Sequence, residues 1–270
     1  MSEAATVPIE PTPGAPAPKP KSKRRGLRAL VIVLVVVVVL GVAAVVADGI
    51  ARGIAQQQVA AKIQERLPES VQGDVDVRIG GFSVIAQYLS GRMDEVELTA
   101  PALEVRGAPV AVDLTLHGVP VDLEQPVGRL SAKVSIDEDA LNTLIAESGA
   151  AAPVGAVELG DGTVGYAGQA EVLGFTVDYT ASARPEAAGD EVLLTPVDVT
   201  VGALGGSIDV SGIVERLLGE DPVAVCVAQY LPEGLRVERV DVAPGTATAW
   251  LGAERFVLDG ASLSTTGSCD

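Results

Sequence analysis

The stretch that decides the fold class alternates apolar and polar side chains: Val110-Ala111-Val112-Asp113-Leu114-Thr115-Leu116. Successive side chains of a β-strand point to opposite faces, so a period of two indicates one apolar and one polar face. Antiparallel sheets commonly bury one face and leave the other in water, which produces this pattern. The stretch therefore predicts half-buried strands of an antiparallel sheet.

The same alternation recurs along the chain, in residues 75–79, 96–98, 119–123, 172–177, 192–201 and 235–242. Glycine and proline separate these runs at short intervals, as hairpin connections require. Helical spacing interrupts them at residues 137–148, where Asp137 is the expected N-cap and Gly149 follows the end, and again at residues 211–218. We therefore predict an α+β fold dominated by antiparallel sheet.

The N-terminal part of the chain reads differently. Residues 1–28 carry six Lys or Arg and two Glu, a charge of +4 (6 − 2), and the first twenty residues contain six prolines, which predicts disorder. Residues 29–47 follow without a single charge, and as a helix they would span about 28 Å, close to the hydrocarbon thickness of a bilayer. We predict a basic cytoplasmic tail (1–28), a transmembrane signal anchor (29–47) and an extracytoplasmic domain (48–270).

The bases before the apolar run place the N-terminus in the cytoplasm and the domain outside, on the envelope (periplasmic) side of the cytoplasmic membrane. A cleaved signal peptide is the alternative, because Val45-Val46-Ala47 offers a small-residue site, but the run is longer than a usual signal core. Beyond the run, apolar residues at near-helical spacing from Ile50 to Leu67 predict an amphipathic helix that packs on the domain and stops at Pro68.

Composition excludes several functions. Acids outnumber bases 36 to 19, for a charge of −17, which argues against a nucleic-acid partner. The single histidine, His117, excludes a site that needs two imidazoles, and two cysteines alone cannot build a zinc finger or an iron–sulfur cluster. We expect no catalytic residues, no metal and no cofactor, so the sequence does not predict an enzyme.

Two motifs have a structural interpretation. Gly160, Gly162 and Gly165 match G-x-G-x-x-G, but further strand rather than a helix follows them, and Asp161-Gly162 is a hairpin-turn pair. Asp137, Glu138 and Asp139 begin like a calcium loop, yet Leu141 and Asn142 occupy positions that need an oxygen ligand and a glycine. We predict a turn for the first motif and a helix cap for the second.

The two cysteines, Cys226 and Cys269, lie in the predicted extracytoplasmic part of the chain. An even count outside the membrane favours a disulfide over a catalytic thiol.

Residues 80–96 place a short apolar loop between two alternating strands, and they hold Phe82 and Tyr88 of only eight aromatic residues. One interpretation is a crossover buried in the core. The other is an exposed apolar lip where lipid enters or the domain touches a membrane. The candidate lipid-binding residues are Phe82, Val84, Ile85, Tyr88 and Leu89.

This element resembles one in the LmeA-like phospholipid-binding proteins of actinobacteria, Gly-Phe-Pro-x-Leu-Thr-Gln…Gly-x-x-x-x-Val. The chain keeps Gly81, Phe82, Gln87, Gly91 and Val96, but has Ser83 for the proline and Ala86 for the threonine. The resemblance covers roughly residues 50–270. It implies a fold similar to tubular lipid-binding domains, with a curved antiparallel sheet around a helix and a lipid cavity. It also implies binding of a phospholipid, of phosphatidylinositol type or a related one, and a part in lipoglycan assembly.

Together these observations predict a membrane-anchored phospholipid-binding or lipid-transfer protein of the cell envelope. Its expected partners are a phospholipid and the cytoplasmic membrane, and the lip formed by the candidate residues should be part of the wall or entrance of the lipid site. An envelope scaffold or adhesion module with a closed core is the second hypothesis. An envelope hydrolase with an unfamiliar acidic site is the third.

Overall fold

The computed structural model describes residues 23–66, 71–122, 125–147, 155–172, 175–203, 206–209 and 222–269. The chain divides into two compact units, and the boundary in the sequence falls between Val46 and Ala47. Most of the predicted tail and the whole predicted helix at residues 211–218 lie outside the described residues.

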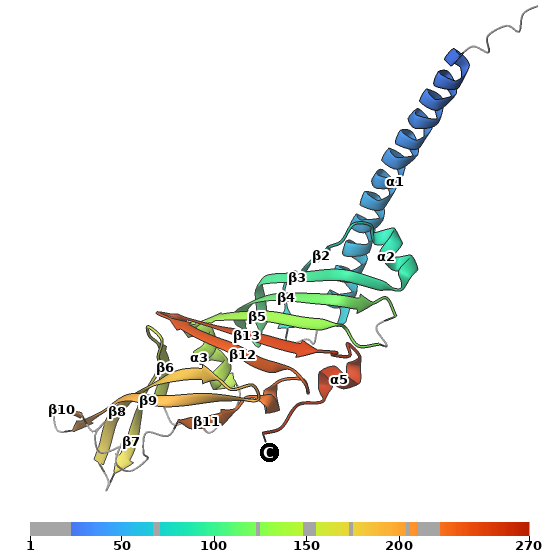
Figure 1. The fold of residues 1–270 in the computed structure, drawn as a ribbon. Coiled ribbons are helices and arrows are strands. Elements are labelled where there is room, and N and C mark those ends of the chain that lie inside the picture. Colours follow the sequence, from blue (N-terminus) through green and yellow to red (C-terminus); the bar gives the residue numbers. More distant parts are fainter. Residues whose placement is uncertain are drawn as a thin grey trace, which may run out of the picture. The chain divides into compact units, whose positions relative to one another are not determined.

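The first helix, α1 (Lys23–Arg66), is continuous over 44 residues (Figure 1). Its part from Leu30 to Glu65 is long and apolar enough to cross a membrane. The sequence predicted an apolar helix followed by an amphipathic helix that leaves the membrane, and in the structure the two form one helix. No proline falls between Lys23 and Arg66, and the glycines there weaken a helix by only about 1 kcal/mol each without breaking it.

The second unit contains two antiparallel sheets. In the seven-stranded sheet the order is β1-β3-β4-β5-β13-β12, and β2 also pairs with β3. Its last two strands come from the C-terminal part of the chain, so chain ends distant in sequence share one sheet. The strands are β1 (Val71–Gln72), β2 (Asp76–Ile79), β3 (Arg92–Val105), β4 (Ala108–Pro120), β5 (Arg129–Asp137), β12 (Arg236–Ala243) and β13 (Thr246–Glu254).

The six-stranded sheet has the order β10-β9-β8-β7-β6, and β11 pairs with β9. Its strands are β6 (Gly155–Leu159), β7 (Val164–Val172), β8 (Phe175–Ala187), β9 (Glu191–Ala203), β10 (Gly206–Asp209) and β11 (Val223–Cys226). The glycine motif lies in the β6–β7 hairpin, where Gly162 has a φ of +70° and Gly160 N donates to Thr163 O over 2.9 Å. The predicted turn is confirmed.

Helix α3 (Glu138–Glu147) links the two sheets. The Asp137 carboxylate accepts from Ala140 N at 2.7 Å, which confirms the predicted cap. The Asn142 side chain donates to Val157 O and accepts from Val157 N, both at 2.8 Å. It therefore satisfies backbone groups of β6 in the way a neighbouring strand would, and Glu138 accepts from Leu159 N at 2.7 Å beside it.

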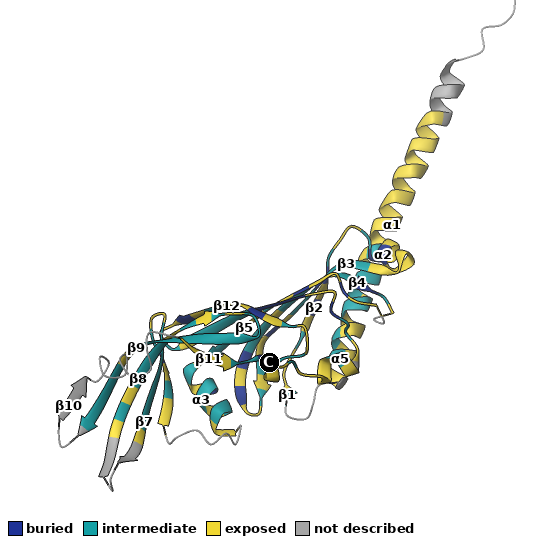
Figure 2. Cartoon of the chain, turned by 60° about the horizontal axis from the view of Figure 1, so that its bottom comes forward, coloured by how far each residue is buried: buried dark blue, intermediate teal, exposed yellow. Residues whose placement is uncertain are grey.

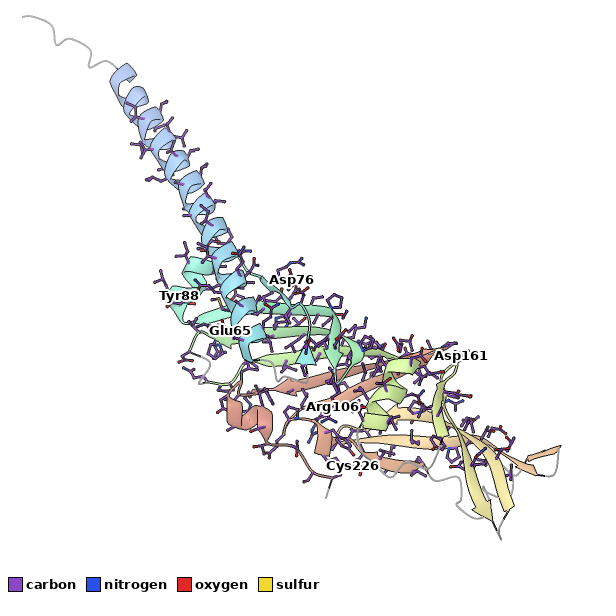
Figure 3. All side chains as sticks on the ribbon, turned by 180° about the vertical axis from the view of Figure 1, so that it is seen from behind. Glu65, Asp76, Tyr88, Arg106, Asp161 and Cys226 are labelled. Atoms are coloured by element: carbon purple, nitrogen blue, oxygen red, sulfur yellow. A yellow bond between two sulfur atoms is a disulfide. The ribbon has the colours of Figure 1, made fainter. Side chains whose placement is uncertain are left out.

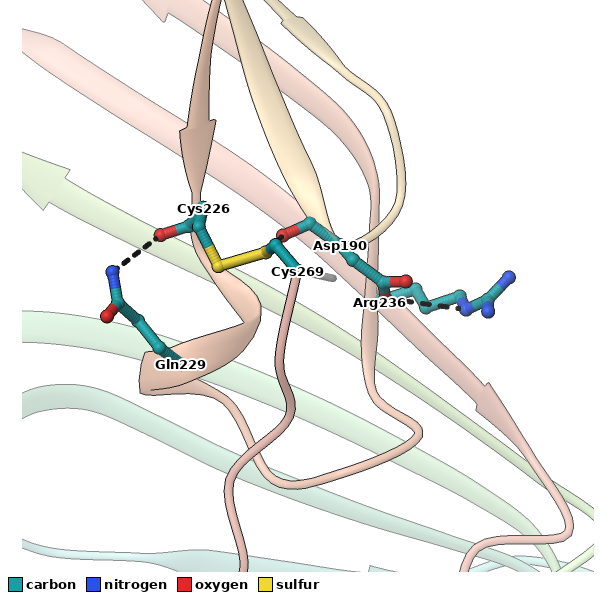
Figure 4. The surroundings of a disulfide bond; sticks show 5 residues. All are labelled: Asp190, Cys226, Gln229, Arg236 and Cys269. Carbon is teal, nitrogen blue, oxygen red and sulfur yellow. Dashed lines mark hydrogen bonds and ion pairs between the residues drawn. A yellow bond between two sulfur atoms is a disulfide. The ribbon is translucent and has the colours of Figure 1, made fainter.

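The predicted disulfide, Cys226–Cys269, is confirmed (Figure 4). It attaches the C-terminal segment, after α5 (Gly260–Ser264), to the end of β11 and the short 3₁₀ turn Ala228–Tyr230. Asp190, directly before β9, pairs with Arg236 of β12 at 3.6 Å in the same region. The two sheets are thus tied at a second place.

The main core lies against the seven-stranded sheet, and Figure 2 shows its buried residues in dark blue. Ala60 and Ile63, near the end of α1, pack against this cluster. The α+β class, with antiparallel sheets after an N-terminal helix, is confirmed, and the described strands form no closed barrel. The core residues are Val77, Val96, Leu116, Val119, Val127, Leu130, Ala253 and Phe256.

Candidate functional site

The predicted apolar loop between β2 and β3 is a short helix, α2 (Val84–Ser90). Ser83 caps its start, because its hydroxyl accepts from Ala86 N at 3.1 Å. Gly91 ends it in the left-handed region, with a φ of +79°. The prediction of a loop was wrong, although the sequence contains both capping residues, Ser83 and Gly91.

One side of α2 docks on the domain through Val84 and Gln87, which are buried. The Gln87 amide donates to Gly80 O at 2.9 Å and accepts from Asp94 N at 2.7 Å. One side chain therefore joins the backbone before α2 to the strand after it. This explains a polar residue in a buried position, because each of these two contacts satisfies a group that burial would leave unpaired.

A second set of contacts fixes α2 to α1 within the second unit. The Asp48 carboxylate accepts from Ser83 Oγ at 2.7 Å and from Ile85 N at 3.0 Å. Arg52, one turn further along α1, donates to Gly81 O at 2.8 Å and pairs with Asp48 at 3.5 Å. We call Asp48, Arg52 and Ser83 the clamp.

Four of the five candidate residues are exposed. Phe82 exposes 97% of its surface, Leu89 81%, Tyr88 63% and Ile85 41%. Val84 is the exception, at 4%. Phe82 is therefore not a core residue, and the element is an exposed apolar helix rather than a buried crossover. Figure 3 labels Tyr88 on α2, far from Asp161 in the β6–β7 hairpin.

The seven-stranded sheet presents a continuous apolar face. Directly paired residues of neighbouring strands share a face, so the registers define rows that run across the sheet. One row is Ala100, Val112, Val134, Ala249 and Val240. We call the whole set the apolar face: Val77, Ile79, Val96, Leu98, Ala100, Leu103, Val110, Val112, Leu114, Leu116, Leu130, Ala132, Val134, Ile136, Val237, Val240, Val242, Ala247, Ala249, Leu251 and Ala253.

Coverage of the apolar face is uneven. At one end Ala60 and Ile63 of α1 pack on it, and Val96 and Leu116 there are buried. Toward the other end α3 contacts β4 and β5, and its Ala140 is buried. Between these helices the residues are only partly buried, so apolar surface stays accessible in the middle of the sheet. These residues are Val112, Val134, Val240 and Ala249, whereas Leu114 and Ala132 beside them are also partly buried but pack against the core cluster.

The six-stranded sheet has a comparable face, on which Tyr166 and Tyr179 lie with ring centroids 6.0 Å apart. Both rings lie close to Gly168, where a side chain would collide with them. Burial among its neighbours raises the pKa of Tyr166. This sheet therefore also offers a surface built mainly from aliphatic and aromatic groups, as its register with Ala181 and Val199 shows.

One hollow of about 740 Å³ lies along β5, β12 and β13. Its walls mix apolar groups with four charged side chains, so it is not the apolar cavity expected between sheet and helix, which stays a prediction. It is lined by Arg129, Leu130, Ser131, Gly189, Gly234, Arg236, Val237, Glu238, Gly252, Ala253 and Glu254.

The described residues include no group of three or more His, Cys, Asp or Glu side chains that could hold a metal ion. His117 lies in β4 and pairs with Glu95 at 3.5 Å, with both side chains well exposed. Asp76 is exposed at the start of β2. Sequence reasoning missed Asp48, Gln87 and Asn142 as structural residues. Only Gln87 carried a signal, as part of the resembling element.

Comparison with known proteins gives one positive result. The family model described as LmeA-like phospholipid-binding matches residues 46–248, about three quarters of the chain. No curated protein and no solved structure matches. The matched range contains α2, the clamp and all described strands except the last six residues of β13, 249–254. The chain therefore belongs to the LmeA-like phospholipid-binding family.

Proposed function

We propose that this protein is anchored by α1 in the cytoplasmic membrane and binds a phospholipid with its acyl chains along the apolar face. The observation that carries the proposal is the accessible middle of that face. A closed-core scaffold would cover these residues, whereas here they remain only partly buried between α1 and α3. Each methylene of an acyl chain placed there would contribute roughly 0.8 kcal/mol before ordering costs.

The orientation follows from charge. The tail of residues 1–28 would lie in the cytoplasm, residues 29–47 would cross the membrane, and residues 48–270 would lie outside. In this arrangement the protein would carry phospholipid at the envelope side and perform no chemistry on it. Family membership supports phospholipid as the ligand. The resemblance further suggests a phosphatidylinositol-type headgroup and a part in lipoglycan assembly.

The candidate residues belong to this proposal as the entrance. Phe82, Ile85, Tyr88 and Leu89 would contact lipid on its way to the apolar face, and Val84 would hold α2 in place from the inside. Their exposure and apolar character support this role.

The test uses the full chain in lipid nanodiscs that contain a phospholipid with a photoreactive diazirine near the end of one acyl chain. After illumination and digestion, mass spectrometry locates the labelled peptides. We expect label on β4, β5 and β13 as well as on the apolar run of α1. Label confined to the apolar run would reject the proposal and favour the closed scaffold. Probes with phosphatidylinositol and phosphatidylethanolamine headgroups, compared in parallel, test the headgroup preference.

A matched pair of variants shows whether the apolar face is the site. Val134→Trp fills the middle of the face, whereas Lys133→Trp adds the same side chain to the opposite face of the same strand. We expect labelling of β4 and β13 to fall in the first variant and to persist in the second, with both melting near the wild type. Equal labelling in the two variants would contradict the proposed site.

A further inference from the structure

We propose that α2, together with Phe82, is a second membrane contact that lies in the lipid interface beside the point where α1 leaves the bilayer. The partner is the bilayer surface itself. The inference goes beyond the proposed function, because it concerns how the domain is seated on the membrane and does not require a bound phospholipid.

The composition of the segment fits a lipid interface. Residues 80–91 carry no charged side chain, although a fifth of the chain is charged. Phe82, Tyr88 and Leu89, which lie within eight consecutive positions, each expose more than half of their surface. Tyrosine suits this position, because its ring is apolar while its hydroxyl can remain in the headgroup region.

The residues of α2 lie on three sides of the helix. At about 100° per residue, Val84 and Gln87 share the side that faces the domain. Ile85, Tyr88 and Leu89 share an adjacent exposed side, and Ala86 and Ser90 share the remaining one. This arrangement is that of a short amphipathic helix that lies in the plane of an interface, with its apolar side toward the lipid.

The position of α2 next to the end of the apolar run identifies the bilayer as the surface that α2 contacts. Asp48 directly follows the uncharged run that ends at Ala47, and its carboxylate binds both Ser83 and Ile85 N. One residue of helix corresponds to only about 1.5 Å of rise, so the clamp holds α2 at the level where the apolar run ends. Arg52 adds a hydrogen bond to Gly81 O from the next turn.

The net charge of the chain explains why the membrane contact is apolar. The chain carries −17 overall, so electrostatic adsorption to anionic lipid is unfavourable. An uncharged segment with four exposed apolar side chains can enter the interface without desolvating an ion. A second copy of the chain could cover the same apolar surface, and the experiment distinguishes this contact from contact with the bilayer.

The experiment places a fluorophore on single cysteines of the full chain in phosphatidylcholine vesicles. The two native cysteines are paired with each other, so an introduced thiol is labelled selectively. Leu89→Cys reports the apolar side of α2, Ala86→Cys the other exposed side, and Asp113→Cys the polar face of β4. The readout is quenching by phosphatidylcholine that carries a nitroxide on its acyl chain.

We expect the label at position 89 to be quenched at least about twofold more than labels at 86 and 113, because an interfacial helix buries one side to a depth of about 5–10 Å. Phe82→Asp in the Leu89→Cys protein should reduce the quenching to the level at position 86. Ala86→Asp adds the same charge on the other side of the helix and should leave the quenching unchanged.

Equal quenching at positions 89 and 86 would overturn the proposal. So would a blue-shifted but unquenched label at 89 that depends on the protein-to-lipid ratio, because that result indicates contact between two copies. Repeating the measurement with Val134→Trp separates the two proposals. If α2 contacts the membrane, quenching of the label at position 89 should persist when the apolar face is filled. Quenching that disappears in this background comes from a bound phospholipid and overturns the proposed membrane contact.

Discussion

Removing the disulfide by Cys226→Ala together with Cys269→Ala should lower the free energy of unfolding of the second unit by about 4 kcal/mol. The two cysteines are 43 positions apart. On the chain-entropy model, closing a loop of that size restricts the unfolded chain by about this amount. The effect therefore acts mainly on the unfolded state, and the folded state should persist in the variant.

The hydrogen bonds around the disulfide support a persistent fold. Gly267 N donates to Leu231 O at 3.1 Å, and Glu233 N donates to Thr265 O at 2.8 Å. These contacts keep the C-terminal segment beside the 3₁₀ turn after the covalent link is lost. For a domain of about this size, 1 kcal/mol corresponds to about 2–4 °C in Tm, so we expect a decrease of roughly 8–16 °C.

The assay is thermal and urea unfolding of the full chain in nanodiscs, followed by strand circular dichroism and by fluorescence of Trp250 on β13. Reducing agent should bring the wild type to the Tm of the double variant and should not affect the double variant itself. A Tm within about 2 °C of the oxidised wild type, in either the reduced protein or the variant, would refute the reasoning. It would mean that positions 226 and 269 are already close together in the unfolded ensemble without the covalent link.

Three further predictions concern stability. Phe256→Ala should cost about 3–5 kcal/mol in urea unfolding because Phe256 is a core residue, whereas Phe82→Ala should change the value by less than about 0.5 kcal/mol; similar costs for both would contradict the assigned environments. Asn142→Leu should cost about 1–3 kcal/mol and accelerate hydrogen exchange at Val157, because two backbone groups of β6 lose their partner; unchanged protection would oppose this role. Backbone hydrogen bonding from Ser262 N lowers the pKa of Asp259 in the folded state. The ionised carboxylate therefore stabilises the fold above the ordinary aspartate pKa of about 3.9, and this stabilisation is lost as the pH falls through the lowered folded pKa. Asp259→Asn should flatten the dependence of Tm on pH below about pH 4, and an unaltered dependence would exclude this effect.

Local patterns predicted the elements that depend on near neighbours. The period of two in residues 110–116 predicted one apolar face, and in the structure Val110, Val112, Leu114 and Leu116 share a face with the apolar residues of β3 and β5 that pair with them. The Asp137 cap and the Asp161-Gly162 turn were predictable for the same reason, because a cap or a tight turn is formed by residues three or fewer positions apart.

The α2 element shows what local patterns do not predict, namely which side of an apolar segment is buried. Val84 and Ile85 are adjacent and equally apolar, yet Val84 is buried and Ile85 is exposed. Which side of the helix turns inward is set by Gln87 between Gly80 and Asp94, and by Asp48 of α1, 35 positions before Ser83. Composition could therefore identify an apolar segment here but could not distinguish a core crossover from an exposed surface.

The sequence by itself determined the uncharged run of residues 29–47, the half-apolar strands and the disulfide partners, because each follows from local spacing or from a count. Only the tertiary structure decided that β12 and β13 return to pair beside β5, that Asn142 satisfies the edge of β6, and that the middle of the apolar face remains accessible between α1 and α3. Pairing of strands more than a hundred positions apart depends on which apolar faces can be covered together, and that competition involves the whole chain at once.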